Sequence, residues 1–202
     1  MFIDSKILNK VSLGLILIFI GYLLYIFIPT FFFVKDHHVG LDKSKYVHKV
    51  TTKPYIKLLA KHLTKGCLSK LCEAQKILNY VTNIEYKVNN WITMSPKKTI
   101  EVGYGDCDDK SNLLISLLNE RGFESYFVLV PGHIFVITHI DDNRLKNTKG
   151  LYLDGKKYYI LESTAKNASL GFPLKYKIDE IEAIIEPFEN KKIDIRKIEY
   201  KK

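Results

Sequence analysis

The sequence predicts an α+β domain, in which a helix packs on an antiparallel β-sheet, preceded by one transmembrane helix. Residues 11–34 contain no charged side chain, whereas the rest of the chain mixes polar and apolar residues. Apolar residues at helical spacing follow Cys107, namely Leu113, Leu114, Leu117 and Leu118. Residues 125–130 and 133–140 alternate as strands do around a Pro-Gly pair, which indicates a hairpin.

The uncharged stretch at residues 11–34 is long enough to cross a membrane as a helix. At about 1.5 Å per residue it exceeds the roughly 30 Å of a hydrocarbon core; a buried core helix is the alternative. No small-residue cleavage site follows it, so we expect an uncleaved anchor rather than a signal peptide. The chain then divides into a tail (1–10), the anchor (11–34), a stalk (35–53) and one folded domain (54–202).

Different features of the sequence favour opposite sides of the membrane for the domain. Lys6 and Lys10 precede the anchor and favour a cytoplasmic N-terminus, but several lysines also follow it in the stalk. Most of the 31 basic residues are lysines spread over the chain, and long domains cross membranes largely regardless of charge. We therefore expect a domain outside the cytoplasm, where disulfides persist.

Two of the three cysteines, Cys67 and Cys72, lie close together around a predicted helix start. Ser69 is suited to cap that helix, whose apolar positions are Leu71, Ile77, Leu78 and Val81. The two thiols would then lie within bridging range. A disulfide and a pair of buried free thiols both fit this spacing, whereas a zinc site with His62 lacks the usual ligand spacing.

The basic composition does not carry the signature of a nucleic-acid-binding protein. A net charge of +9 would suit an anionic partner. However, the basic residues are not interleaved with aromatic residues as a base-stacking platform requires. The basic C-terminal tail alternates with Ile193, Ile195 and Ile198, as a solvated edge strand does. We expect no nucleic-acid partner.

Two short signals place Cys107 at the beginning of its helix. Ser95-Pro96 is typical of a helix start, and Gly103 ends that short helix before the next begins. Asp106 is suited to cap the following helix, with Asp109 in its first turn. Cys107 therefore lies where unpaired N–H groups and the helix dipole favour a thiolate over a thiol.

A histidine and a carboxylate stand on two of the predicted strands. His133 opens the strand 133–140, and Glu162 lies near the end of the segment 158–164. Because Tyr158, Ile160 and Glu162 share a strand face, this carboxylate can accept a hydrogen bond from an imidazole nitrogen and orient the ring. Cys107, His133 and Glu162 together supply the parts of a thiol acyl-transfer site.

The order and local sequence of these residues resemble the transglutaminase-like superfamily, whose core is papain-like. The motifs that carry the resemblance are Gly105-Asp106-Cys107-Asp108-Asp109, Gly132-His133 and Glu162-Ser163-Thr164. The residues that lead up to the cysteine also match: Trp91, Ser95-Pro96, Thr99 and Gly103-Tyr104. The resemblance covers roughly residues 55–172, and Glu162 departs from it, since the family acid is more usually aspartate.

The resemblance implies a papain-like fold and an enzyme that acts on peptide or carboxamide bonds through a Cys-His-Glu triad and a thioester. With the predicted anchor at residues 11–34, we expect this enzyme to be bound to the membrane and its substrate to be a protein or peptide of the cell envelope. Water as acceptor makes such an enzyme a peptidase or amidase, and a lysine amine makes it a crosslinker. Trp91 and Tyr104 are candidates for oxyanion or substrate contacts. A catalytically inactive binding module is the alternative, while a zinc hydrolase on Cys107 and His133 lacks further ligands. We expect no cofactor and no metal.

Overall fold

The computed structural model describes residues 5–40, 46–48, 50–51, 53–88, 93–189 and 191–202. Its α-helices are α1 (Ser5–His37), α2 (Pro54–Leu63), α3 (Lys70–Asn83), α4 (Pro96–Val102) and α5 (Cys107–Asn119). Its strands are β1 (His38–Gly40), β2 (Tyr46–His48), β3 (Glu85–Tyr86), β4 (Tyr104–Gly105), β5 (Ser125–Val130), β6 (His133–Thr138), β7 (Gly150–Leu153), β8 (Lys156–Leu161), β9 (Ala183–Glu186), β10 (Lys191–Lys192) and β11 (Ile198–Lys201). Short 3-10 helices span Asn143–Leu145 and Ile178–Glu180.

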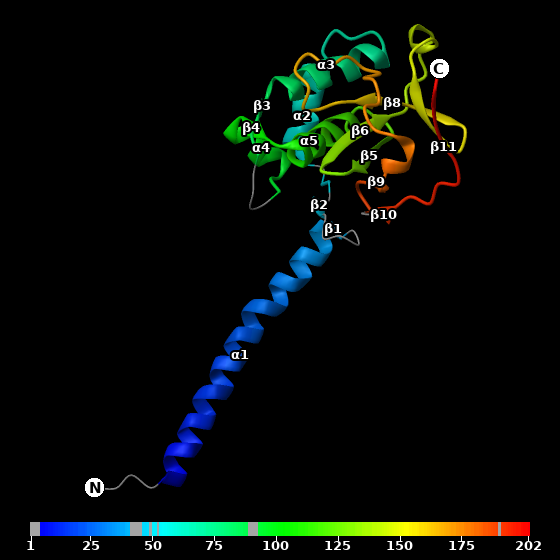
Figure 1. Ribbon diagram of the computed structural model, residues 1–202. Helices are drawn as coiled ribbons and strands as arrows, with labels where there is room; N and C mark the ends of the chain where they lie inside the picture. Colours follow the sequence, from blue (N-terminus) through cyan, green and yellow to red (C-terminus); the bar gives the residue numbers. More distant parts are fainter. Residues whose placement is uncertain (1–4, 41–45, 49, 52, 89–92, 190) are drawn as a thin grey trace.

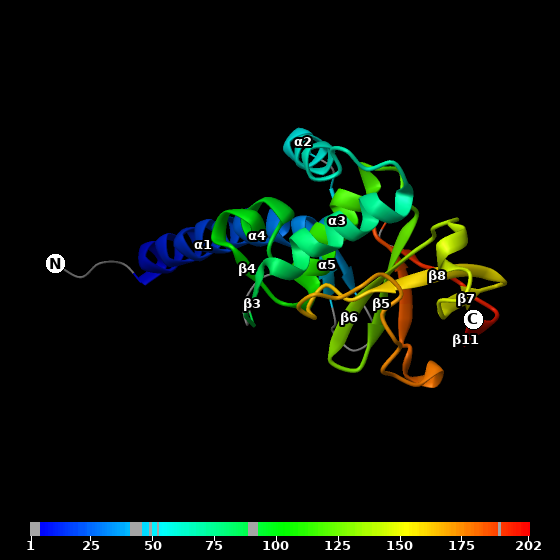
Figure 2. The same cartoon turned by 90° about the horizontal axis from the view of Figure 1, so that it is seen from above.

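Seven strands form an antiparallel sheet in the order β10-β9-β5-β6-β8-β7-β11. Helices α2 to α5 gather on one side of it, and the two views agree on this arrangement (Figures 1 and 2). The predicted hairpin is confirmed, because Val130 pairs with His133 across the Pro-Gly turn. The second strand ends at Thr138 rather than at residue 140. The mixed helix and antiparallel sheet architecture confirms the predicted fold class.

The two faces of the sheet bury two separate apolar clusters. Ile134, Val136 and Leu161 face helix α5, which packs on β5 and β6. Phe135, Ile137 and Ile160 face the other way and are covered by the chain that follows β8. The alternation predicted for these strands therefore sorts neighbouring residues into different clusters. The residues that cover the second cluster are Phe172, Leu174, Tyr176, Ile178, Ile181, Ile193, Ile195, Ile198 and Tyr200.

Helix α4 begins and ends at the predicted signals. The Ser95 side chain accepts a hydrogen bond from the Lys98 N–H, and Pro96 occupies the first turn, where its missing N–H costs nothing. Gly103 follows with a φ of 73°, a left-handed conformation that glycine adopts readily. The chain then turns directly into β4, which pairs with β3 in parallel.

Helix α3 is joined to its surroundings by a cap, a disulfide and an ion pair. The Ser69 side chain accepts a hydrogen bond from the Cys72 N–H, as predicted for an N-cap. A disulfide connects Cys67 to Cys72, whose Cα atoms lie 5.5 Å apart. Glu73 is buried and accepts from both Lys70 and Arg121, so helix α3 is tied to the loop after α5. These contacts hold α3 in a fixed position beside α5.

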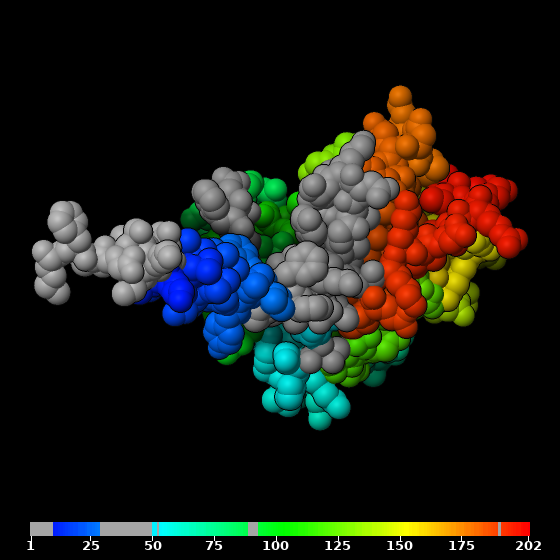
Figure 3. Space-filling model, turned by 90° about the horizontal axis from the view of Figure 1, so that it is seen from below, coloured from blue at the N-terminus to red at the C-terminus, as the bar shows by residue number. Residues whose placement is uncertain are grey.

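Helix α1 projects from the folded domain as a single rod (Figure 1), and its residues 10–28 are seen at the surface in the space-filling view (Figure 3). Within it, Lys10–Ile28 has a mean hydropathy of 2.6 and is not buried by the rest of the protein. By length and composition this segment is able to cross a membrane, a test that a signal sequence near the N-terminus would also pass. The apolar surface of α1 is therefore exposed unless lipid or another protein covers it.

We expect the Cys67→Ser/Cys72→Ser double variant to unfold with a free energy about 2 kcal/mol lower than the oxidised chain, because the crosslink restricts the unfolded state. Urea denaturation of the full chain in detergent micelles measures the difference. Cys107→Ser is the matched control, since it removes a thiol without removing a crosslink. Equal stability of the oxidised chain and the double variant would contradict the prediction.

Candidate active site

The nucleophile candidate Cys107 is the first residue of helix α5 and carries a free, half-buried thiol. It is brought there by a tight approach at Gly105. A Cβ atom at Gly105 would lie 2.8 Å from the Asp109 Cβ, which is closer than carbon atoms tolerate, and in a tight 3.2 Å contact with the Thr99 Cγ2. Only glycine therefore lets the chain pass between α4 and α5 and begin the helix at Cys107.

His133 and Glu162 meet at the same end of the sheet. His133 is the first residue of β6, and Glu162 follows the last residue of the adjacent β8. The His133 Nε2 lies 3.0 Å from one Glu162 carboxylate oxygen. The other oxygen accepts hydrogen bonds from the Thr164 N–H at 3.0 Å and the Thr164 hydroxyl at 2.6 Å. The carboxylate is thus held on both sides, and its orientation is fixed.

The charges of this group favour a protonated imidazole. Burial alone would lower the pKa of His133, but the interactions with the Cys107 and Glu162 side chains outweigh it and raise the pKa to about 9. Burial would raise the pKa of Glu162, yet its hydrogen bonds with His133 and Thr164 lower it. Because Nε2 is engaged by a carboxylate, Nδ1 is the ring nitrogen left to face the thiol.

A buried hydrogen bond connects the cysteine helix to the strand end that carries the carboxylate. The Ser111 and Ser163 hydroxyl oxygens lie 3.0 Å apart, and both residues are fully buried. Ser111 is one helical turn after Cys107, and Ser163 directly follows Glu162. The contact therefore sets the position of the carboxylate relative to the start of α5.

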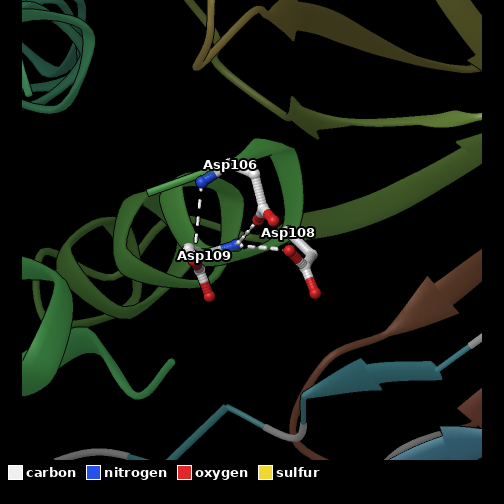
Figure 4. A group of neighbouring side chains, drawn as sticks. All are labelled: Asp106, Asp108 and Asp109. Atoms are coloured by element: carbon white, nitrogen blue, oxygen red, sulfur yellow. Dashed lines mark hydrogen bonds between the residues drawn. The ribbon is translucent and has the colours of Figure 1, made fainter. Parts of the chain in front are cut away.

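Three aspartates crowd the first turn of α5 (Figure 4). Asp106 caps the helix, as the sequence predicts, and the Asp109 side chain accepts in return from the Asp106 N–H, which completes a capping box. The Asp109 N–H also donates to Asp108. The remaining oxygens accept from elsewhere: the Thr93 hydroxyl donates to Asp108 at 2.8 Å, and the Met94 N–H donates to Asp109. The cluster therefore joins the segment around residue 93 to the helix start.

The same three carboxylates lie close enough to hold a cation, because one ligand atom of each lies within 4.8 Å of the others. Their environment favours protons as well. Burial, reinforced by Asp106, raises the pKa of Asp108 to about 8, and burial raises the pKa of Asp109 to about 6. Since most of their oxygens already accept N–H or O–H donors, we assign the cluster a capping role.

Lys110 is an unusual member of α5, because its side chain is only 1% exposed. The Nζ atom donates to the Ile84 carbonyl oxygen at 2.6 Å. Burial lowers its pKa to about 8, and the charge of Glu162 acts in the opposite direction. Ile84 directly precedes β3, which pairs with the β4 strand before Cys107. Lys110 therefore holds the start of β3 against helix α5.

The structure brings Cys107, His133 and Glu162 together but does not assign the two further candidates. Trp91 lies outside the described residues. Tyr104 is half-buried on β4, and the Lys87 ammonium lies 4.7 Å from its ring centre. Its oxyanion or substrate role therefore stays a prediction.

Tyr176 belongs to the site because it contacts His133, although the sequence did not predict this. Its ring stacks on that of His133, with 6.1 Å between ring centres, and on that of Phe135 at 6.4 Å. Burial raises the pKa of Tyr176, and the charges of Glu162 and Cys107 raise it further. No local motif marks this tyrosine, since it reaches the site from a loop more than forty residues after His133.

Comparison with known proteins finds a family match over the part of the chain that contains Cys107 and His133. Residues 57–136 match the family model of the transglutaminase-like superfamily core. A crystal structure named a "putative cysteine protease", from Cytophaga hutchinsonii, is 19% identical with a TM-score of 0.43, covering 55% of this chain and 37% of that one. Another, named a "putative protease", from Parabacteroides distasonis, is 14% identical with a TM-score of 0.45, covering 71% and 28%. No curated protein sequence matches significantly.

We expect Asp108→Asn to stabilise the fold near neutral pH. The pKa of the Asp108 carboxyl is raised to about 8 in the folded chain, whereas the unfolded chain releases this proton near pH 4. The free energy of unfolding of the unaltered chain therefore falls as the pH rises from about 4 to 8. One pKa unit corresponds to about 1.4 kcal/mol, so the gain at pH 8 should reach at least that value and vanish near pH 4.

Urea unfolding of the full chain at several pH values measures this difference. Asp141→Asn is the matched control, because Asp141 is exposed and lies outside the cluster. Parallel pH curves for the Asp108 variant and the unaltered chain would show that this carboxyl is not buried as described.

Proposed function

Because residues 57–136 carry a transglutaminase-like core, we propose that this chain is a membrane-anchored thiol enzyme acting on peptide or carboxamide bonds. The observation that supports the proposal most directly is the placement of His133 between Cys107 and a fixed carboxylate. An imidazole with a pKa near 9 is a cation at neutral pH, as a proton donor to a leaving nitrogen must be. The chain spans little more than a third of the first of its solved neighbours, so its activity and substrates remain proposals.

In the proposed reaction the Cys107 sulfur attacks the substrate carbonyl carbon and forms a C–S bond. As the tetrahedral intermediate collapses, the C–N bond breaks and the leaving nitrogen takes a proton from His133 Nδ1. The thioester is then attacked by water, or by an amine, which returns its proton to His133 while the thiolate leaves. The backbone N–H of Cys107, the first residue of α5, would donate to the oxyanion.

Glu162 would act by holding the imidazole rather than by exchanging protons with the substrate. Its carboxylate fixes the ring through Nε2 and stabilises the imidazolium form. The hydrogen bonds from Thr164 in turn fix the carboxylate, which compensates for the extra methylene of glutamate relative to the aspartate usual in the family.

We expect Cys107→Ala and His133→Ala to lower turnover by at least about 100-fold, because each removes a group that reacts with substrate. Glu162→Gln should cost less, since an amide oxygen still accepts from Nε2–H. The wild-type rate should fall above pH 9, where His133 loses the proton it gives to the leaving nitrogen. The assay is mass spectrometry of envelope peptides incubated with the full chain in detergent, scoring cleavage, deamidation and crosslinks.

His139→Ala is the matched control for the histidine, because it lies just beyond the same strand and contacts the Lys157 carbonyl oxygen instead. Turnover that survives Cys107→Ala would exclude a thiol mechanism. If the wild type and all variants fold but the wild type turns over none of these peptides, the binding-module alternative is favoured.

We also propose that α1 is an uncleaved anchor and that the domain lies outside the cytoplasm. The exposed apolar segment Lys10–Ile28 supports membrane insertion. The Cys67–Cys72 disulfide supports an oxidising compartment, because such crosslinks are rare in the cytosol.

Protease added to intact spheroplasts should remove the domain and leave a membrane-bound fragment that contains α1. A cytoplasmic protein of the same cells serves as the control for lysis. Complete protection of the domain in intact spheroplasts, with digestion after lysis, would place it in the cytoplasm.

A further inference from the structure

The segment that connects α1 to α3 carries nearly all of the net charge of the chain. Residues 43–72 contain eight lysines and no acidic residue, whereas the whole chain has a net charge of +9. Six of these lysines recur at every fourth position, from Lys45 to Lys65. Because an α-helix has 3.6 residues per turn, this spacing keeps lysines along one side of the chain wherever the segment is helical.

Helix α2 lies within this segment and turns its lysines outward. Ile56 and Ala60 on its inner face are fully buried in the core cluster that also contains the apolar residues of α5. On the outer face, Leu58 is 69% exposed although it is apolar. The outer face and the two ends of the helix form a surface that we call the lysine face, which consists of the exposed residues Lys53, Lys57, Leu58, Lys61, His62 and Lys65.

The positive charge of the lysine face is not neutralised by the rest of the domain. Among the residues that the structure describes, no carboxylate forms an ion pair with any of its four lysines. Lys76 adds a further positive charge at one end, because its Nζ donates to the Lys65 carbonyl oxygen at 3.1 Å. A row of cations around an exposed leucine fits a partner that offers anionic groups above an apolar layer.

The path of the chain holds the lysine face close to the end of α1. Strands β1 and β2 pair antiparallel, so that His48 lies opposite His38, the residue that directly follows α1. Lys53 comes five residues after His48, which corresponds to at most about 18 Å of extended chain. The Val50 N–H donates to the Pro187 carbonyl oxygen at 3.1 Å, which fastens this short connection to the domain. Residues of α2 are accordingly seen at the surface in the view from the α1 side (Figure 3).

Resting on the proposed anchor, we infer that the lysine face docks on the anionic phospholipid surface of the bilayer that α1 spans. Each lysine close to such a surface strengthens the attachment about fivefold, and Leu58 is placed to enter the headgroup layer. A nucleic acid also offers anionic groups, but nothing holds it beside α1, whereas the bilayer is always there. Docking would fix the orientation of the domain, and with it the edge that carries Cys107 and His133, relative to the membrane. The inference depends neither on the thiol chemistry nor on the side of the membrane.

The test measures the reactivity of individual lysines in the full chain incorporated into lipid nanodiscs. Discs of phosphatidylcholine alone are compared with discs of an equimolar mixture of phosphatidylcholine and phosphatidylglycerol. Acetylation by an N-hydroxysuccinimide ester, followed by mass spectrometry, gives the rate for each lysine. The lysines of the lysine face should react at least about threefold more slowly in the mixed discs, because anionic headgroups engage their ammonium groups. High salt should remove this protection, since it shortens the range of the attraction.

The Lys57→Glu/Lys61→Glu variant should lose the protection of Lys53 and Lys65 in the mixed discs. Lys146→Glu/Lys149→Glu is the matched control, because it makes the same change of charge at two exposed positions in the loop before β7, and it should leave that protection unchanged.

Equal acetylation rates in the two kinds of disc, with the chain incorporated in both, would overturn the inference and leave the anchor standing. Protection that persists at high salt would assign the surface to an apolar contact and would also overturn the inference. A chain that enters neither kind of disc would instead overturn the proposed anchor, and the docking of the lysine face with it.

Discussion

The site depends on one constraint: the polar first half of helix α5 is buried, and each polar group there must find a partner. Asp109, Lys110 and Ser111 are each at most 1% exposed. An unpartnered polar group in such a position costs several kcal/mol, so the fold is stable only if other segments supply donors and acceptors. They are supplied by the Met94 N–H, the Ile84 carbonyl oxygen and the Ser163 hydroxyl. Three segments distant in sequence are therefore drawn to the first two turns of one helix, and Cys107 is the residue at its tip.

The charge of the site depends on the aspartates at the start of α5 as well as on Cys107, His133 and Glu162. A helix start attracts negative charge, and three aspartates occupy it. Crowding and burial raise the pKa values of Asp108 and Asp109, so part of that negative charge is neutralised by protons at neutral pH. Glu162, whose pKa is lowered, is ionised at neutral pH and faces His133. It stabilises the imidazolium through Nε2, and in the proposed reaction the other ring nitrogen, which faces the thiol, holds the proton for the leaving nitrogen.

Local signals were sufficient to predict the short helix after Ser95, the N-cap at Asp106 and the hairpin around the Pro-Gly turn, because capping and turn chemistry act over a few residues. The ordered Cys, His and Glu motifs indicated which side chains to compare. Contacts made across the fold left no such trace. Nothing near Tyr176 predicts that its ring covers His133, and nothing near Lys110 predicts that a lysine is buried to bind the Ile84 carbonyl. The position of the segment 172–176, from which Tyr176 reaches the site, depends on hydrogen bonds to β8 and β11, which are set by the completed sheet.

The alternation of the strands explains why the reactive groups meet at the end of the sheet. Cys107 packs with the cluster on the α5 face, whereas His133 shares its face with Phe135 on the opposite side. Side chains on opposite faces of a sheet cannot meet through its middle. Cys107 and His133 meet at the end of the sheet instead, because His133 begins β6, Glu162 follows β8, and α5 begins at the same edge. The thiol is consequently approached from the helical layer and the imidazole from the other face.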